Sequence, residues 1–189
     1  MAENTVNAQK IVGNMEFAGL SPKVWSREVF KDKRGSFSML FQYSKVRELA
    51  NTSVNFIQTN LIVSEPYSLR GWHFSPIEDN HWKIVTCIVG QVREAVLDVR
   101  PSSNTFGYAS FVDFDATGSV LLIPPGFAHA VQTLSSPSEI VYASTVAYEF
   151  SREISINPIN HIWPIWENLG SVSERDMLSP SFEEWKDRF

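Results

Sequence analysis

Three side chains in the middle of this sequence, His73, Lys83 and His129, could together take a proton from carbon and hold the negative charge that results. A histidine titrates near neutral pH, which makes His73 a candidate general base. A lysine ammonium has three hydrogen-bond donors and no lone pair for a cation, so Lys83 beside two imidazoles disfavours a divalent metal. The same ammonium suits an anion. The combination indicates chemistry through an enolate, although either histidine alone would also fit a structural role.

The residues around His129 resemble a signature of the cupin β-barrels. Gly118, the Pro-Pro-Gly of residues 124–126 and His129 follow one another as in the second cupin segment. The first cupin segment normally supplies histidines and a glutamate to a metal, with six residues between that glutamate and a glycine. Here six residues separate Lys83 from Gly90. The resemblance therefore implies a cupin-like barrel that carries a lysine in place of a metal-binding glutamate.

Short runs rich in Val, Ile, Phe and Thr occupy the chain from residue 53 to residue 148, and turn residues separate them. Such runs are typical of strands in an antiparallel sandwich or barrel. Gly90 and Gln91, between two runs, predict a tight hairpin. The predicted strands are residues 54–63, 82–89, 92–99, 108–114, 120–123 and 140–148.

The rest of the pattern predicts a single domain with short helices at the periphery and the C-terminus. Residues 44–49 fit a short helix, and the Ser-x-x-Glu spacing from Ser181 predicts a helical turn at residues 182–188. A chain of 189 residues can bury one substantial core. We therefore expect an all-β, jelly-roll (cupin-like) β-barrel as one domain, 1–189. Its expected parts are an N-terminal extension (1–24), the barrel (25–167) and a C-terminal segment (168–189).

Composition argues against several classes of function. Sixteen Lys and Arg residues stand against 21 Asp and Glu, and the basic residues are scattered, unlike those of a nucleic-acid surface. The one cysteine, Cys87, lies in an apolar run and is expected to be a buried thiol without a disulfide. Neither a signal peptide nor a membrane-spanning run is visible. We expect a cytoplasmic protein that binds neither nucleic acid nor membrane.

Two tyrosines are candidates for the proton donor that a base such as His73 would need on the opposite side of a carbanion. Tyr142 and Tyr148 are six residues apart, so both face the same way if they share a regular strand. For either tyrosine alone, packing is the alternative role. The spacing leaves open which carboxylate supports His73, and the candidates are Asp98, Asp113, Asp115 and Asp176.

Motifs along nearly the whole chain, from about residue 25 to residue 182, resemble those of the dTDP-4-dehydrorhamnose 3,5-epimerases. In order, they are residues 30–37, 58–60, 69–74, Lys83, residues 98–100 with 105–107, residues 124–129, Tyr142 and residues 173–176. So many motifs in the family's order identify the chain as a member.

The resemblance implies a role for each matching residue. His73 matches the base that removes the proton beside a C4 ketone, and Asp176 matches the carboxylate that orients that imidazole. Lys83 matches the group that stabilises the enolate oxygen, and Tyr142 the acid on the opposite face. The resemblance also implies a homodimer that uses neither metal nor cofactor, with N-terminal strands packed onto the neighbouring subunit. The residues implied in binding a dTDP-linked sugar are Arg34, Phe37, Gln58, Asn60, Arg70, His129 and Tyr148.

The chain departs from the family pattern at Met39, where glutamate is usual, at Ala130, where glycine is usual, and at Trp72, where leucine is common. Because Met39 removes a charge, an unusual deoxysugar inverted only at C3 or only at C5 is an alternative substrate. A catalytically silent sugar-nucleotide-binding protein is a second alternative. A metal-dependent cupin is a third, and it would use His73, His81, His129 and Glu78.

Overall fold

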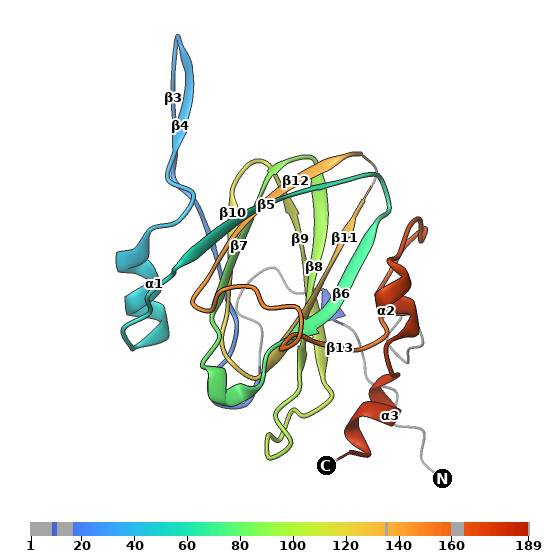
Figure 1. The fold of residues 1–189 in the computed structure, drawn as a ribbon. Coiled ribbons are helices and arrows are strands. Elements are labelled where there is room, and N and C mark those ends of the chain that lie inside the picture. Colours follow the sequence, from blue (N-terminus) through green and yellow to red (C-terminus); the bar gives the residue numbers. More distant parts are fainter. Residues whose placement is uncertain (1–8, 11–16, 135, 160–164, 189) are drawn as a thin grey trace.

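Two β-sheets packed face to face form the body of the protein (Figure 1). The structure is a computed structural model that describes residues 9–10, 17–134, 136–159 and 165–188. One sheet has the strand order β1 (Gln9–Lys10), β9 (Ala109–Asp115), β8 (Gln91–Asp98), β11 (Phe127–Thr133), β6 (Leu69–Phe74) and β13 (Ile154–Ser155). The other has the order β2 (Lys23–Ser26), β10 (Ser119–Ile123), β7 (Lys83–Val89), β12 (Ser138–Ser144) and β5 (Gln58–Ser64). This architecture confirms the predicted all-β, cupin-like jelly roll.

The main core lies between the two sheets, where alternate residues of facing strands point inward. Val85 and Leu121 from the five-stranded sheet meet Val96 and Val112 from the six-stranded sheet in one buried cluster. Cys87 belongs to the same cluster and is fully buried, as predicted.

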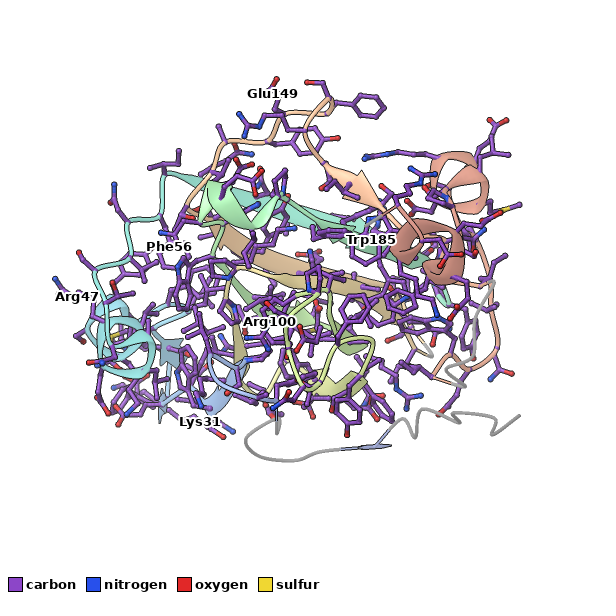
Figure 2. The ribbon with its side chains drawn as sticks, turned by 90° about the horizontal axis from the view of Figure 1, so that it is seen from below. Lys31, Arg47, Phe56, Arg100, Glu149 and Trp185 are labelled. Carbon is purple, nitrogen blue, oxygen red and sulfur yellow. The ribbon has the colours of Figure 1, made fainter. Side chains whose placement is uncertain are left out.

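Short helices cover the outer faces of both sheets. Helix α1 (Tyr43–Ala50) packs Val46 and Ala50 against the five-stranded sheet. The six-stranded sheet is covered by the C-terminal part of the chain, including α3 (Phe182–Lys186), whose Trp185 lies against the body of the molecule in Figure 2. Ser181 and Glu184 form the predicted capping box before α3. Both predicted helices are therefore confirmed.

A two-stranded hairpin, β3 (Val29–Asp32) and β4 (Gly35–Ser38), projects away from the two sheets (Figure 1). Its strands pair only with each other among the described strands. Phe30 and Phe37 on this hairpin are largely exposed. The hairpin thus displays aromatic surface far from the main core.

Two local predictions are wrong. Gly90 does not close a hairpin, because β7 and β8 belong to different sheets and the chain crosses between the sheets there. The left-handed conformation of Gly90, with φ of 80°, allows that sharp turn. The strand predicted at 140–148 ends at Ser144, so Tyr148 lies on the following loop and shares no strand with Tyr142. None of the helices in the described ranges could cross a membrane.

Candidate active site

A cavity of about 520 Å³ opens between the two sheets and the C-terminal segment. Strands β6 and β11 supply one wall, and β7 and β12 of the other sheet supply the opposite wall. The structure brings together at this cavity seven of the residues predicted from the sequence: Arg70, His73, Lys83, His129, Tyr142, Tyr148 and Asp176.

His73 and Asp176 form a hydrogen-bonded pair on one side of the cavity. His73 Nε2 lies 2.7 Å from Asp176 Oδ1, and the backbone N–H of Gly71 donates to Oδ2 at 3.3 Å. Asp176 is only 2% exposed. Burial alone would raise the pKa of Asp176, but the hydrogen bonds from His73, Gly71 and Ser173 together hold it below its usual value. The carboxylate is therefore kept ionised beside the imidazole.

The start of a short helix places Asp176. Helix α2 (Glu174–Leu178) begins after Ser173, whose side-chain oxygen accepts a hydrogen bond from the backbone N–H of Asp176. This N-cap fixes the first turn of α2 and with it the direction of the Asp176 side chain. Of the four carboxylates that the sequence left open as partners of His73, the structure selects Asp176.

A close approach between β6 and β11 positions His73 next to His129. The two histidines are paired residues of these antiparallel strands. A Cβ added to Gly71 would lie 2.6 Å from both the Ala130 Cβ and the carbonyl oxygen of His129. Only glycine fits at position 71, because any side chain would push β6 away from β11. Ala130, a departure from the family pattern, is thus accommodated by the missing side chain opposite it.

Lys83 and His129 face each other inside the barrel. Lys83 Nζ lies 2.9 Å from His129 Nε2. Burial lowers the pKa of Lys83 to about 8, and the negative charges of Glu153 and Glu94 oppose that shift. Burial, followed by the charge of Lys83, lowers the pKa of His129 well below its usual value. His129 is therefore neutral at pH 7, and its ring accepts from the Lys83 ammonium.

Tyr142 and Tyr148 both line the cavity, from β12 and from the loop at residues 145–153. Burial, followed by the charges of Glu153 and Tyr148, raises the pKa of Tyr142, so its hydroxyl keeps its proton. Asn60 is the residue paired with Tyr142 across β5 and β12. Gln58 Nε2 donates to Asn60 Oδ1 at 2.9 Å, and Gln58 Oε1 accepts from the backbone N–H of Tyr148 at 3.0 Å. Gln58 and Asn60 therefore lie beside the two tyrosines on β5, and neither lines the cavity itself.

Charged side chains surround the mouth of the cavity. The exposed Arg70 is held by a hydrogen bond from its Nε to Ser64 Oγ at 3.1 Å. Arg175 Nη1 contacts Glu153 Oε2 at 2.8 Å, and its guanidinium lies over the Phe150 ring. The contact between Arg175 and Glu153 joins α2, which carries Asp176, to the loop at residues 145–153. Glu149 of this loop lies at the outer edge of the molecule in Figure 2.

Two predicted binding residues lie away from this cavity. Arg34 and Phe37 are on the projecting β3–β4 hairpin, where Arg34 pairs with Asp32 and both Arg34 and Phe37 are exposed. Met39, which replaces the usual glutamate, follows the end of β4 and does not line the cavity either. Within one chain, the hairpin and the cavity are separate features.

The arrangement does not favour the metal-dependent alternative. Glu78 lies on an exposed turn, and His81 Nδ1 is 2.6 Å from Ser75 Oγ. Lys83 Nζ faces the Nε2 lone pair of His129 that a metal would need. In the described part of the chain, no three His, Cys, Asp or Glu side chains converge as metal ligands would.

Comparisons with known proteins identify the family of this chain. The family model for dTDP-4-dehydrorhamnose 3,5-epimerase matches residues 20–184. The chain is 36% identical over 162 residues to the dTDP-4-dehydrorhamnose 3,5-epimerase of Salmonella typhimurium, covering 83% of this chain and 88% of the relative. The chain belongs to the dTDP-4-dehydrorhamnose 3,5-epimerase family.

Related structures and sequences show how this family varies. A crystal structure of dTDP-6-deoxy-D-glucose-3,5-epimerase from Legionella pneumophila, in complex with dTDP-4-keto-L-rhamnose, matches with a TM-score of 0.79 and 28% identity. That match covers 86% of this chain and 88% of the other. A dTDP-4-dehydro-6-deoxyglucose 3-epimerase from Streptomyces bikiniensis is 28% identical over 87% of this chain and 93% of its own length. The family relatives thus include enzymes named for one centre and for two.

Sequence reasoning missed three charged residues of this epimerase family member. Glu153 and Arg175 line the cavity, and Glu94 lies buried behind His129. Arg175 stands next to Asp176 in a recognised motif, which was a usable signal. Glu94 interrupts an apolar strand, and a charge in such a run also indicates an interior function. Glu153 carries no comparable signal.

Proposed function

We propose that this protein epimerises a nucleotide-linked 4-keto-6-deoxy sugar, of the dTDP-4-dehydro-6-deoxyglucose type, at C3, at C5 or at both. The observation that carries the proposal is the His73–Asp176 pair on one wall of the cavity, with Lys83 and Tyr142 on the other. The family relationship supports the same activity. The reaction moves protons only, so neither a redox step nor a cofactor is required.

His73 is the proposed base. Its Nε2 is bonded to Asp176, so the other ring nitrogen, Nδ1, is the one that takes the proton beside the ketone. Asp176 holds the ring in that tautomer and stabilises the imidazolium that forms. The carboxylate can do so at neutral pH because its hydrogen bonds keep its pKa low.

Lys83 is the proposed electrostatic catalyst. Removing a proton beside a ketone places negative charge on the carbonyl oxygen, and a fixed ammonium stabilises that charge more in the transition state than in the ground state. Lys83 is buried at the cavity wall and is held in place by His129. Its effect is strong there, because little water screens a charge in a buried site.

Tyr142 is the proposed acid. It comes from β12 of the five-stranded sheet, whereas His73 comes from β6 of the six-stranded sheet. A sugar ring bound between these walls exposes opposite faces to the two side chains. A proton removed by His73 and a proton delivered by Tyr142 would therefore invert the carbon centre.

The proposed assembly is a homodimer in which the β3–β4 hairpin of each subunit reaches the cavity of the other. Phe37 on the hairpin is 64% exposed, and Leu61 and Val63 on the edge strand β5 are 58% and 61% exposed. Apolar surface of this kind on the edge strand of a sheet favours contact with a second copy. Such a contact would give Arg34 and Phe37 the substrate-binding role that their position within one chain does not.

Incubation with dTDP-4-keto-6-deoxyglucose in heavy water, followed by NMR, tests the proposed activity. Deuterium at both C3 and C5 supports a 3,5-epimerase, and deuterium at one carbon narrows the activity to a mono-epimerase. Binding without any solvent exchange, measured by calorimetry and NMR on the same sample, would identify a catalytically silent protein and overturn the proposal.

A further inference from the structure

One buried charged residue has no part in the mechanism above. Glu94 on β8 is 1% exposed and points into the interior behind His129. Neither of its carboxylate oxygens has a hydrogen-bond partner in the described structure. An uncompensated carboxylate inside a barrel is costly, and apolar residues would fill the same space more stably. We therefore expect an interaction of Glu94 that offsets this cost.

His129 lies between Glu94 and Lys83. Its Nε2 is 2.9 Å from Lys83 Nζ, and its Nδ1 is 3.7 Å from Glu94 Oε2. The Lys83 ammonium can only donate, so Nε2 must accept and the ring proton must sit on Nδ1. Nδ1 also lacks a hydrogen-bond partner among the described residues, and it faces the carboxylate. The three side chains therefore form a line. The Lys83 ammonium donates to His129 Nε2, and the N–H at His129 Nδ1 is directed toward the Glu94 carboxyl group.

The charges of the two outer groups support each other. Burial raises the pKa of Glu94 to about 8, and the Lys83 charge opposes that shift. Burial lowers the pKa of Lys83 to about 8, and the charges of Glu153 and Glu94 oppose it. Both groups thus titrate in the same pH range, and each one, when charged, favours the charged form of the other.

Other groups also act on this line from neighbouring elements. Glu153, before β13, is the second anion that favours a charged Lys83. His73 on β6 and His81 before β7 disfavour charge on His129, which keeps its ring neutral and able to accept from Lys83. Burial lowers the pKa of His81 itself to about 3. Burial raises the pKa of the Cys87 thiol on β7, and the charge of Glu94 raises it further. Two anions, Glu153 and Glu94, raise the pKa of Lys83. Of these two, Glu94 lies on the far side of the His129 ring from Lys83.

We propose that Glu94 is a positioning residue that acts through His129 to hold the Lys83 side chain toward the cavity and to favour its charged ammonium form. For its catalytic consequence this inference rests on the proposed function. Its physical content, the link between Glu94 and the protonation of Lys83, exists in the protein without substrate.

The test is Glu94→Gln, which keeps the shape and an acceptor oxygen but removes the charge. With side-chain ¹³C-labelled lysine and no substrate, the NMR titration of Lys83 should move to lower pH by about one unit. Lys83→Met assigns the signal. Glu48→Gln removes a charge from the exposed face of α1 and should leave the titration unchanged. An unchanged Lys83 titration in Glu94→Gln overturns the proposal.

Activity supplies a second readout. The alkaline limb of the kcat profile of Glu94→Gln should move by the same amount, so that turnover above the limb falls about 10-fold. Glu94→Asp retains the charge and should restore most of the shift. If Glu94→Gln does not fold, the wild-type protein still decides, because coupled groups give Lys83 and Glu94 titration curves with a shared inflection. Independent single-step curves would overturn the proposal, whereas wild-type protein without solvent exchange would overturn only the proposed function.

Discussion

His73 and Asp176 are 103 residues apart in the chain, and their side chains meet at 2.7 Å between Nε2 and Oδ1. His73 comes from strand β6 and Asp176 from the first turn of α2. Asp176 is also anchored by Gly71 and Ser173, so it is held before any substrate arrives. A rigid partner of this kind fixes the imidazole tautomer that the proposed proton transfer requires.

Asp176→Asn should lower the rate of solvent exchange by about 10²- to 10⁴-fold, because the amide no longer stabilises the imidazolium. The expected loss is in kcat, with little change in KM. Exchange into substrate in heavy water, followed by NMR, measures it. Glu174→Gln, on the exposed side of the same helix, is the matched control. Near wild-type exchange in Asp176→Asn would contradict the role assigned to this pair.

Tyr142→Phe should separate proton removal from inversion. The base, its partner and Lys83 remain, so deuterium exchange continues, but the proton returns mainly from the face on which His73 lies. We expect substrate that carries deuterium but keeps its original configuration, and at least 10-fold less inverted product than the wild-type protein forms. Product analysis by NMR distinguishes the two outcomes. Full inversion would assign the acid to another group, and Tyr148→Phe is then the comparison.

The activity should fall as the pH rises through about 8, because the ammonium form of Lys83 is the one that acts and burial lowers its pKa to that value. Lys83→Met removes the charge at similar length and should slow exchange by about 10²- to 10³-fold below pH 8, with the difference from wild type shrinking as the pH rises above 8. Lys45→Met, on α1 and outside the lining of the cavity, is the control. A wild-type rate that is flat from pH 7 to pH 10 would contradict the role of Lys83.

Two inactive variants should restore activity when mixed, if each hairpin serves the cavity of the partner subunit. Phe37→Ala damages the hairpin and His73→Ala damages the cavity, so a mixed dimer keeps one complete site. Random exchange of subunits predicts about a quarter of wild-type activity. Mixing His73→Ala with Lys83→Met, both in the cavity, should restore none. Sedimentation of Leu61→Arg tests the interface itself, and a monomeric wild-type protein would rule this arrangement out.

Asp98→Asn should destabilise the fold by about 2–4 kcal/mol at pH 7, because the fully buried carboxylate accepts hydrogen bonds from Arg100, Ser103 and Thr105. Burial alone would raise the pKa of Asp98, but these bonds lower it. Its contribution is therefore present above the unfolded pKa and is lost as the pH falls through the folded one. Urea unfolding at pH 7 and pH 3 should show the difference shrinking in acid. Asp115→Asn, at the end of β9 where the side chain is half-buried, should change stability much less.

The strands and the meeting of His73, Lys83 and His129 at one cavity could be predicted from the sequence, since alternating apolar residues mark buried strands and a lysine beside histidines disfavours a metal. The partner of His73 could not be read from spacing, because it depends on how the C-terminal helix docks across the sheet. Gly90 was misread for a similar reason: a glycine turn looks the same whether the next strand pairs with the last or crosses to another sheet. The position of Tyr148 depended on where β12 ends.

Because Asp176, the carboxylate proposed to orient the base, is carried by α2, a ribosome must have made nearly the whole chain before the His73–Asp176 pair can form. The two sheets can assemble earlier, since all of their strands precede residue 156. A proteolytic cut in front of α2 would separate the carboxylate from the imidazole, and it would also free Phe182 and Trp185 from the core beside the six-stranded sheet. The last residues of the chain therefore serve both the packing of that sheet and the geometry of the site.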